Sequence, residues 1–274
     1  MRRAIIAGIA GQDGSYLAEL LVEKGYKVLG FLKKDEDTST LARVIKDVVL
    51  EDTELVRKED IIRWTRLFGP DEVYNFAAMS FIPTSWDDPY GAFQANTLLV
   101  AAFLEVLKNH CPSARFYQAS YVASGILYNH ESPRRQDHFV TQKIARAAAE
   151  ISLGRSEKLK LGSIDARRDW GYAGDFVRGI WLMLQQPSAA DYVLATGETH
   201  SIRDYLQEAF SHVGLRWEDW VETDPALVRP VDVGQLVGNP SRAKKFLGWI
   251  PEVSFPQLVR MMVDSQLERL KNSR

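Results

Sequence analysis

The first 120 residues alternate between short apolar runs and longer segments in which apolar residues recur at helical spacing. The apolar runs have the length and composition of strands and occupy residues 3–7, 26–32, 48–50, 72–76 and 115–119. Amphipathic segments separate them, of which the clearest are 59–67 and 90–109. Strands that alternate with helices indicate a parallel sheet covered on both faces. The pattern therefore predicts an α/β fold with a doubly wound parallel sheet and right-handed crossovers.

After about residue 129 this regular alternation stops. The elements predicted there are helices at 139–153, 172–186 and 202–213 and short strands at 158–161 and 192–195. This change predicts two domains. Residues 1–128 form the domain with the parallel sheet, and residues 129–274 form a smaller mixed α/β domain. The helix at 172–186 is expected to return to the first domain.

Three glycines at three-residue spacing lie between the first strand and the first helix, in the run Gly8-Ile-Ala-Gly11-Gln12-Asp13-Gly14. This is the position of the phosphate-binding turn in a Rossmann dinucleotide fold. The first glycine makes the tight turn, the second lets backbone amides approach a pyrophosphate, and the third lets the helix pack closely. The run predicts a nucleotide site, with a glycine-rich turn that holds no ligand as the alternative.

Composition excludes several other classes. The chain has 34 basic and 36 acidic residues and a net charge of −2, which favours neither nucleic acid nor a membrane surface as a partner. No apolar run is expected to span a bilayer and no signal peptide precedes the first strand. The single cysteine, Cys111, fits a reducing, cytoplasmic setting. The five histidines show no metal-ligand spacing, so no metal site is predicted.

One part of the chain conflicts with the predicted topology. Only the five residues from Ser120 to Ser124 separate the strand at 115–119 from another apolar run, which begins at Gly125. Parallel neighbours need a crossover of about a dozen residues or more, usually a helix. Either these two runs are not parallel neighbours, or residues of the crossover are missing here. The second interpretation is the one we favour.

Several runs resemble one enzyme family. They are the glycine turn, Tyr-Asn-Phe-Ala-Ala-Met-Ser at 74–80, Phe-Tyr-Gln-Ala-Ser at 116–120, Asn-His-Glu-Ser-Pro-Arg-Arg at 129–135 and Arg-Asp-Trp-Gly at 168–171. In order, and over nearly the whole chain, they resemble the GDP-mannose 4,6-dehydratase family of extended short-chain dehydrogenase/reductases. The resemblance implies a Rossmann domain, a smaller C-terminal domain that holds a GDP-sugar, and NADP as the cofactor.

The resemblance also implies a mechanism. A tyrosine, paired with a lysine four residues on, takes the proton of the sugar 4-hydroxyl while hydride leaves C4. A glutamate assists the loss of water across C5 and C6, and the hydride returns to C6. The segment that carries these residues should follow Ser120. Here Tyr121 comes next, and the residue four positions on is Gly125. The catalytic residues are therefore unassigned, and the segment expected after Ser120 is missing where the crossover is missing.

Basic residues at the end of the second strand bear on the choice of cofactor. Lys33 and Lys34 suit the 2′-phosphate of NADP, whereas an acid there would suit NAD. Asp35, Glu36 and Asp37 follow them and keep NAD, or a simple solvated charge cluster, as alternatives. By resemblance, the remaining cofactor residues are Asp52, Thr53, Ala77, Ala78, Ser80, His130 and Arg135. For these residues, a place in a turn, a helix cap or tight packing is the alternative to cofactor binding.

The substrate candidates also come from the resemblance. Arginine suits a diphosphate because its planar guanidinium pairs bidentately with phosphate oxygens. Surface salt bridges are the alternative role for the charged candidates, and Glu131 is interpreted as a loop residue, not as the catalytic glutamate. The residues expected to hold the GDP-sugar are Asn129, Val140, Lys143, Arg168 and Arg229.

Three functions remain open from the sequence. The first is an NADP-dependent dehydratase that acts on GDP-mannose. The second is a reductase or epimerase that acts on the corresponding 4-keto sugar, and the third is a nucleotide-sugar-binding homologue without turnover if the Tyr-x-x-x-Lys segment is truly absent. The resemblance further implies a homodimer or homotetramer.

Overall fold

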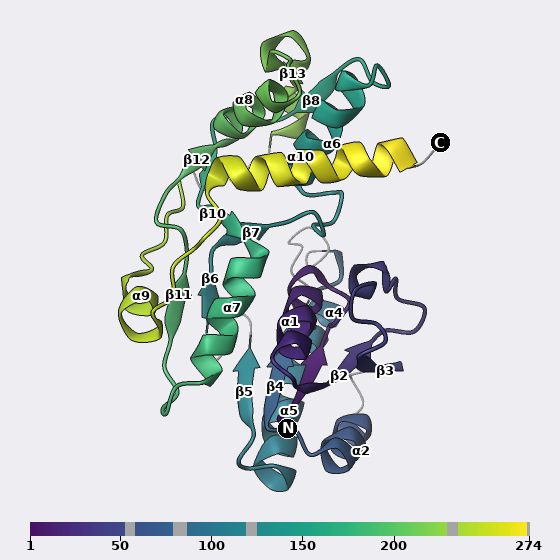
Figure 1. The fold of residues 1–274 in the computed structure, drawn as a ribbon, viewed down its shortest axis with the longest axis vertical. Coiled ribbons are helices and arrows are strands. Elements are labelled where there is room, and N and C mark those ends of the chain that lie inside the picture. Colours follow the sequence, from purple (N-terminus) through teal and green to yellow (C-terminus); the bar gives the residue numbers. More distant parts are fainter. Residues whose placement is uncertain (53–57, 79–86, 119–124, 229–234, 273–274) are drawn as a thin grey trace. The chain divides into compact units, whose positions relative to one another are not determined.

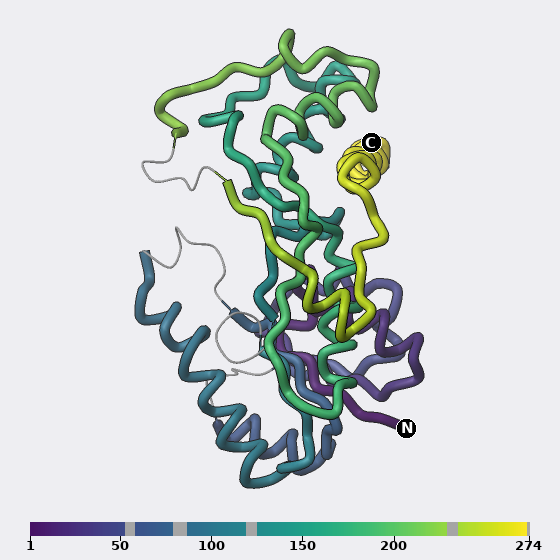
Figure 2. The backbone as a smooth tube through the Cα atoms, turned by 90° about the vertical axis from the view of Figure 1, so that its left-hand side faces the viewer, coloured from purple at the N-terminus to yellow at the C-terminus, as the bar shows by residue number. Residues whose placement is uncertain are grey.

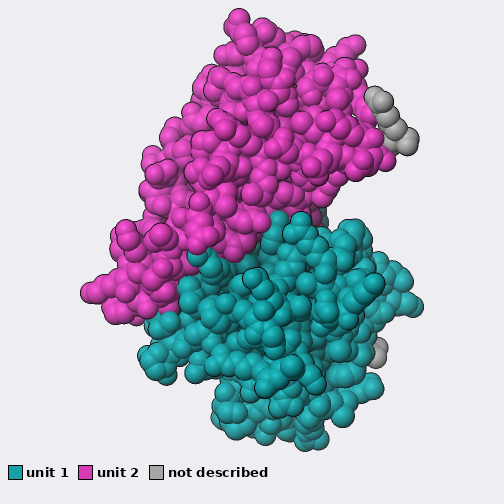
Figure 3. All heavy atoms as spheres, in the orientation of Figure 1, with its two compact units in different colours: residues 1–126, 177–192 teal, residues 127–176, 193–274 magenta. Residues whose placement is uncertain are grey.

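The computed structural model describes residues 1–52, 58–78, 87–118, 125–228 and 235–272 (Figure 1). The chain forms two compact units, coloured separately in Figure 3. The first unit comprises Met1–Ile126 and Val177–Tyr192, and the second comprises Leu127–Phe176 and Val193–Arg274. The division at 126 lies two residues before the predicted one at 128. Most of the helix predicted to return, α7 (Ala173–Leu184), belongs to the first unit.

The first unit is built on a five-stranded parallel sheet with the order β3-β2-β1-β4-β5. The prediction of a doubly wound parallel sheet is confirmed. At its centre Ala7 pairs with Phe31 of β2 and with Asn75 of β4. The chain therefore runs outward in two directions from β1, which creates a switch point at the carboxyl ends of β1 and β4. The strands are β1 (Arg3–Ala7), β2 (Lys27–Leu32), β3 (Val48–Asp52), β4 (Glu72–Asn75) and β5 (Arg115–Gln118).

Helices cover the sheet because each presents an apolar stripe to it. Ile61 of α2 and Phe103 of α5 are fully buried in one cluster with Ile5 and Val73 of the strands, so α2 and α5 share one face. The helical elements of this part are α1 (Gln12–Glu23), η1 (Ser39–Leu41), α2 (Lys58–Phe68), α4 (Pro89–Phe93), η2 (Gln94–Leu98) and α5 (Leu99–His110).

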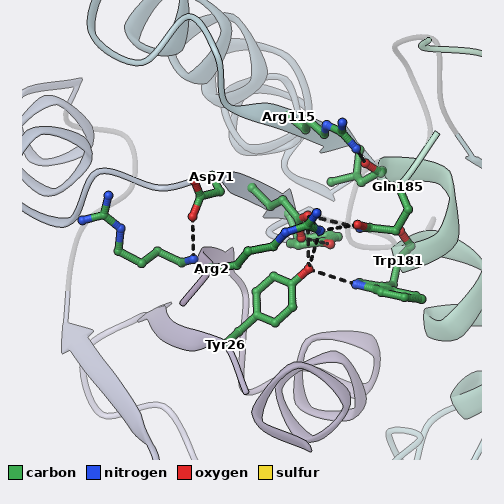
Figure 4. Close-up of polar contacts among 10 residues, drawn as sticks. Arg2, Tyr26, Asp71, Arg115, Trp181 and Gln185 are labelled. Atoms are coloured by element: carbon green, nitrogen blue, oxygen red, sulfur yellow. Dashed lines mark hydrogen bonds and ion pairs between the residues drawn. The ribbon is translucent and has the colours of Figure 1, made fainter. Parts of the chain in front are cut away.

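A polar cluster at the amino ends of the strands fastens α7 to the first unit (Figure 4). The Glu72 carboxylate is 2% exposed and accepts hydrogen bonds from Tyr74 Oη (2.7 Å), Gln185 Nε2 (3.1 Å) and Arg2 Nη1 (3.2 Å). The Trp181 indole N–H donates to the Tyr26 hydroxyl at 3.2 Å. A buried carboxylate is costly unless it is paired, so these contacts hold α7 in place. They explain physically why this helix returns to the first unit.

The second unit packs three helices around an aromatic centre. Trp170 and Tyr205 meet edge to face with ring centroids 5.6 Å apart, and Phe255 stacks on Trp170 at 6.1 Å. The strands here have two or three residues each and form two-stranded pairs. The elements are β7 (Asn129–Glu131), α6 (Val140–Ser152), β8 (Leu159–Leu161), β9 (Arg167–Arg168), β10 (Trp170–Tyr172), β12 (His200–Ser201), α8 (Ile202–His212), η3 (Trp217–Asp219), β13 (Val221–Thr223), η4 (Pro225–Leu227), α9 (Ser241–Leu247) and α10 (Phe255–Asn272).

Two remaining strands bear on the topological conflict seen in the sequence. β6 (Gly125–Leu127) pairs with β11 (Tyr192–Leu194), and not with β5. Among the described strands, β5 and β6 are therefore not hydrogen-bonded neighbours, which agrees with the first of the two interpretations of this conflict. Residues 119–124, which connect them, lie outside the described residues. Ser120, after which the catalytic segment was expected, is one of these residues.

The segment from α4 to α5 corrects another expectation. Pro89–His110 is one helical stretch of 22 residues that contains an 18-residue window with a mean hydropathy of 1.3, so by length and composition alone it could cross a membrane. The sequence predicts a long helix here and no apolar run that spans a bilayer. The difference arises because apolar side chains occur on the outward side of this helix as well as on the side that packs against the sheet. Figure 2 shows this helix as the long coil at the left.

Candidate functional site

The glycine turn lies where β1 ends and α1 begins, at the switch point of the sheet. Gly8 has φ +77°, a left-handed conformation that side chains rarely adopt. A Cβ at Gly8 would lie 3.0 Å from the backbone nitrogen of Ala77, just beyond β4. A Cβ at Gly14 would lie 2.2 Å from the Gly8 carbonyl oxygen. The turn therefore requires glycine at both positions, because backbone atoms occupy the space of a side chain.

The amino end of α1 carries no side-chain cap. Its N-cap is Gly11, which makes no side-chain hydrogen bond, and Asp13 lies in the first turn. The Gln12 side-chain amide donates to Asp13 at 3.3 Å. The first amides of a helix lack partners within the helix and carry partial positive charge, which makes such an end an anion site. The structure thus brings Gly8, Gly11, Gln12, Asp13 and Gly14 together where β1 passes into α1.

The end of β4 forms the neighbouring wall of this site. Asn75 is fully buried; its side chain donates to Gln118 Oε1 at 2.7 Å and accepts from the Ala77 amide at 3.1 Å. These bonds fix the backbone of Ala77 beside Gly8. Ala77 is half-buried and Ala78 is exposed, so both small residues lie at the carboxyl edge of the sheet, as predicted.

The end of β2 lies at the same edge. Lys33 and Lys34 are both exposed directly after the strand. The two acids nearby are engaged locally: Glu36 accepts from the Lys33 amide at 2.8 Å, and Asp37 accepts from the Ser39 amide and hydroxyl. These hydrogen bonds from Ser39 lower the pKa of Asp37.

Asp52, the last residue of β3, is exposed and pairs in register with Leu32 of β2. It therefore lies at the carboxyl edge next to the two lysines. Other positions that the sequence singled out lie outside the described residues: the predicted site residues Thr53, Ser80 and Arg229, and Ser120 with the segment that was expected to lead into the catalytic motif. The predictions for these residues stay untested.

Strand β7 carries the start of the Asn-His-Glu-Ser-Pro-Arg-Arg motif. Asn129 and His130 are half-buried and pair in register with Trp170 and Gly171 of β10. The His130 ring stacks on Phe176 with centroids 4.7 Å apart, and its Nδ1 lies 2.7 Å from the Tyr128 carbonyl oxygen. That contact favours the tautomer with the proton on Nδ1. His130 is therefore held rigidly within the second unit.

Glu131 corrects the interpretation of this residue as part of a loop. It ends strand β7 and is 2% exposed. Its carboxylate accepts from the Thr141 hydroxyl at 2.8 Å and forms an ion pair with Arg135 at 3.2 Å. The Arg135 guanidinium also lies 3.4 Å from the centre of the Phe139 ring. These contacts give Arg135, which was predicted to bind the cofactor, a structural role. It neutralises a buried carboxylate and links β7 to α6.

The amino end of α6 is a second helix end without a side-chain cap. Val140 is its first residue, and the N-cap, Phe139, makes no capping side-chain hydrogen bond. Lys143 is exposed one turn further on. Burial lowers the pKa of His138, and the positive charges of Arg135 and Lys143 lower it further. The nearby Asp137 carboxylate acts in the opposite direction and raises the pKa of His138.

Arg168 lies in β9, directly before a buried carboxylate. Asp169 is fully buried and accepts from the amides of Thr196 (2.8 Å), Gly197 (3.0 Å) and Gly238 (3.1 Å), and from the Thr196 hydroxyl (2.7 Å). Asp169 thus joins three segments around Arg168. Sequence reasoning did not single it out, although an acid within Arg-Asp-Trp-Gly was the available signal. Among the described residues, no cluster of three metal-ligating side chains occurs.

With this geometry established, comparison with known proteins becomes informative. The family model described as GDP-mannose 4,6 dehydratase matches residues 5–121 and 120–262. GDP-mannose 4,6 dehydratase 1 of Arabidopsis thaliana is 38% identical over 331 aligned positions, which cover 99% of this chain and 91% of that protein. The chain belongs to the GDP-mannose 4,6-dehydratase family. The family includes a human relative, 32% identical over 98% of this chain and 92% of that protein.

Solved structures agree on the fold. A UDP-glucose 4-epimerase of Thermotoga maritima, determined with UDP-glucose, has a TM-score of 0.83 at 17% identity and covers 98% of this chain and 99% of that chain. RMD of Pseudomonas aeruginosa, complexed with NADPH, has a TM-score of 0.79 at 20% identity over 98% of this chain and 100% of that chain.

The family match is interrupted at one point. Its two parts meet at Ser120 and Tyr121, the position at which the sequence lacks a crossover. The alignment to the Arabidopsis relative spans 331 positions, 57 more than the 274 residues of this chain. The family member thus carries residues that have no counterpart here. None of the ten tyrosines in this chain has a lysine four residues on.

Proposed function

We propose that this protein is a GDP-mannose 4,6-dehydratase, which converts GDP-mannose to GDP-4-dehydro-6-deoxymannose with NADP as its cofactor. The observation that carries the proposal is the match to curated dehydratases over 98–99% of the chain at 31–38% identity. The uncapped, glycine-lined turn at the switch point supports a bound dinucleotide.

The residues of the first unit fit a nicotinamide dinucleotide. The backbone amides in the first turn of α1 would hold its pyrophosphate, and the small residues Ala77 and Ala78 leave room along the end of β4. When bound, the nicotinamide takes up hydride from the sugar and returns it. Lys33 and Lys34 support NADP over NAD, because Glu36 and Asp37 at this strand end already accept hydrogen bonds from the local chain.

Replacing both Lys33 and Lys34 with alanine should weaken NADP binding about tenfold or more and leave NAD binding unchanged. A charge-assisted hydrogen bond contributes about 1.5 kcal/mol or more, and about 1.4 kcal/mol corresponds to a factor of ten. Lys27→Ala, at the opposite end of β2, is the matched control. Isothermal titration with both cofactors measures the effect. An equal loss for NAD and NADP would remove the support for a 2′-phosphate site.

The second unit supplies the candidate site for the sugar nucleotide. The uncapped end of α6, with Val140 and Lys143, would hold the GDP diphosphate, and Arg168 would add a guanidinium from β9. The positive charges of Arg135 and Lys143 near this helix end support an anion at this position. Asn129, the first residue of β7, supplies an amide side chain for the same ligand.

The interruption after Ser120 favours a second candidate function. Without Tyr-x-x-x-Lys, the described chain keeps both nucleotide sites but has no assigned base for the sugar 4-hydroxyl. The second candidate is therefore a nucleotide-sugar-binding protein without turnover. The intact mass of the natural protein bears on this choice: 31.0 kDa matches the present sequence, and a higher mass would reveal residues at the interruption.

One experiment separates the two candidates. Purified protein is supplied with NADP and GDP-mannose, and proton NMR follows the appearance of the C6 methyl group of the product. The His138 ring resonance is titrated in parallel. A diphosphate near this ring favours its protonated form, so binding should raise the lowered pKa of His138. Formation of product together with the pKa shift supports the dehydratase. The pKa shift without product supports the binding protein. If neither the product nor the pKa shift is observed, both candidates are overturned.

A further inference from the structure

Residues 33–41, here called the β2–β3 segment, close against the glycine turn. The hydroxyl of Thr40, in η1, donates to the Ala10 carbonyl oxygen at 2.8 Å, across 30 residues of sequence. Element η1 packs against α1, and Leu41 at its end is fully buried. The β2–β3 segment is therefore anchored in the core, and its Thr40 hydroxyl reaches the backbone of the turn.

The Ala10 carbonyl belongs to the peptide unit that leads into α1. On the other side of the same peptide bond, the Gly11 amide donates to the Gly8 carbonyl oxygen at 3.1 Å. Because a peptide unit is planar, a hydrogen bond on each side of it fixes its orientation. Gly11 is the N-cap of α1, so this plane sets the direction in which the first helix amides point. Thr40 therefore supplies a hydrogen bond that orients the amino end of α1.

The first half of the turn is held in a different way, by β2 itself. The amides of Gly8 and Ile9 donate to the Phe31 carbonyl oxygen at 3.2 Å and 3.4 Å. The Ile9 side chain is fully buried. Ala10 is the next residue along the chain, and its carbonyl is held by Thr40. The β2–β3 segment thus continues the support that β2 gives to the turn.

Hydrogen bonds within the β2–β3 segment join its two ends. The Lys33 amide donates to the Glu36 carboxylate at 2.8 Å, and the Glu36 amide donates to the Lys33 carbonyl oxygen at 3.1 Å. Asp35 between them has φ +60°, in the left-handed region that aspartate tolerates better than most residues. The Asp37 carboxylate accepts from the Ser39 amide and hydroxyl. These bonds link the lysines at the start of the segment to η1 at its end.

We propose that Thr40 is a positioning residue that couples the 2′-phosphate end of the NADP site to the pyrophosphate end. The inference rests on the proposed function, in which Lys33 and Lys34 meet the 2′-phosphate and the amino end of α1 meets the pyrophosphate. A phosphate on the lysines restrains the β2–β3 segment, and the Thr40 hydroxyl transmits this restraint to Ala10. NAD lacks the 2′-phosphate and cannot restrain the segment in this way. The hydroxyl therefore contributes to selectivity for NADP as well as to affinity.

Thr40→Val tests the proposal, because it removes the hydroxyl and keeps the shape of the side chain. Isothermal titration of the full chain should show a loss of about fivefold in NADP affinity and of about twofold or less in NAD affinity, within the contribution of one hydrogen bond. Thr40→Ser keeps a hydroxyl and should restore both affinities. Thr38→Val is the matched control, since Thr38 is half-buried like Thr40 and its side chain makes no capping hydrogen bond. This control should bind both cofactors as the unmodified chain does.

A double-mutant cycle separates coupling from a general loosening of the turn. In a Lys33→Ala, Lys34→Ala background, Thr40→Val should weaken NADP binding no more than NAD binding, because the phosphate contacts are gone. The proposal is overturned by unchanged NADP affinity in Thr40→Val, by equal losses for NADP and NAD, or by the full NADP loss in the background without the lysines. Absence of NADP binding by the unmodified chain would instead contradict the cofactor assignment, and this inference with it.

Discussion

Gly14→Ala is expected to abolish cofactor binding, with an affinity loss on the order of a hundredfold or more. The added Cβ would lie 2.2 Å from the Gly8 carbonyl oxygen and 2.7 Å from Ile9 Cα. Both neighbours are backbone atoms, so α1 must move away from the turn. The helix amides then no longer point at the pyrophosphate, and losing two charge-assisted hydrogen bonds costs about 3 kcal/mol, about a hundredfold.

Two other glycines separate this effect from a general loss of stability. At Gly11 a Cβ would meet only the Gly8 carbonyl oxygen, at 3.3 Å, so Gly11→Ala should keep the fold. The NADP affinity of this variant then shows how closely the ligand approaches the Gly11 backbone. Gly154 has φ +67° with nothing within 4 Å, so Gly154→Ala adds only left-handed strain of about 1 kcal/mol. Isothermal titration with NADP measures all three variants. Unchanged NADP affinity in folded Gly14→Ala would contradict the assignment of the turn as the cofactor site.

Asp169→Asn is expected to destabilise the protein by about 3–5 kcal/mol, the usual cost of breaking a buried charged network. The carboxylate is fully buried and accepts four hydrogen bonds from the Thr196, Gly197 and Gly238 backbone and the Thr196 hydroxyl. An asparagine replaces one acceptor oxygen with an NH2 group that faces other donors. Because Asp169 adjoins Arg168, GDP affinity should fall as well.

Urea unfolding measures the loss of stability in Asp169→Asn as a lower urea concentration at the unfolding midpoint. Asp165→Asn is the matched control, since the Asp165 side chain is 76% exposed and pairs with Arg203 at the surface. An exposed pair of this kind contributes at most about 1 kcal/mol. If Asp169→Asn unfolded at the same urea concentration as Asp165→Asn, Asp169 would not hold these segments together.

Features that depend on neighbouring residues were predictable from the sequence. The spacing of Gly8, Gly11 and Gly14 predicted the turn because the local backbone geometry calls for glycine at these positions. The Ser201 cap of α8 was predictable for the same reason: its hydroxyl accepts from the Asp204 amide only three residues away, at 3.0 Å. The five strands of the parallel sheet also stood out as apolar runs, most continuously where the strands are buried, as in β1 and β2.

Short strands and buried charges were not predictable in this way. β9 and β12 have two residues each, too few to show a period. The motif residue Glu131 was interpreted as a loop residue, but it ends the short strand β7 and is buried. Only the position of Arg135 and Thr141 around it shows that its charge and lone pairs are satisfied.

The sequence by itself determined the class of fold, the glycine turn between β1 and α1 and the family of this protein, because these depend on residue types at short, fixed spacings. The tertiary structure decided where the buried charges find partners: Gln185 reaches Glu72 across 113 residues, and Gly238 reaches Asp169 across 69. It also decided which side of the Pro89–His110 helix remains exposed. The physical reason is that a charge or an apolar surface is satisfied by whatever lies next to it in space, and chain folding alone determines that neighbour.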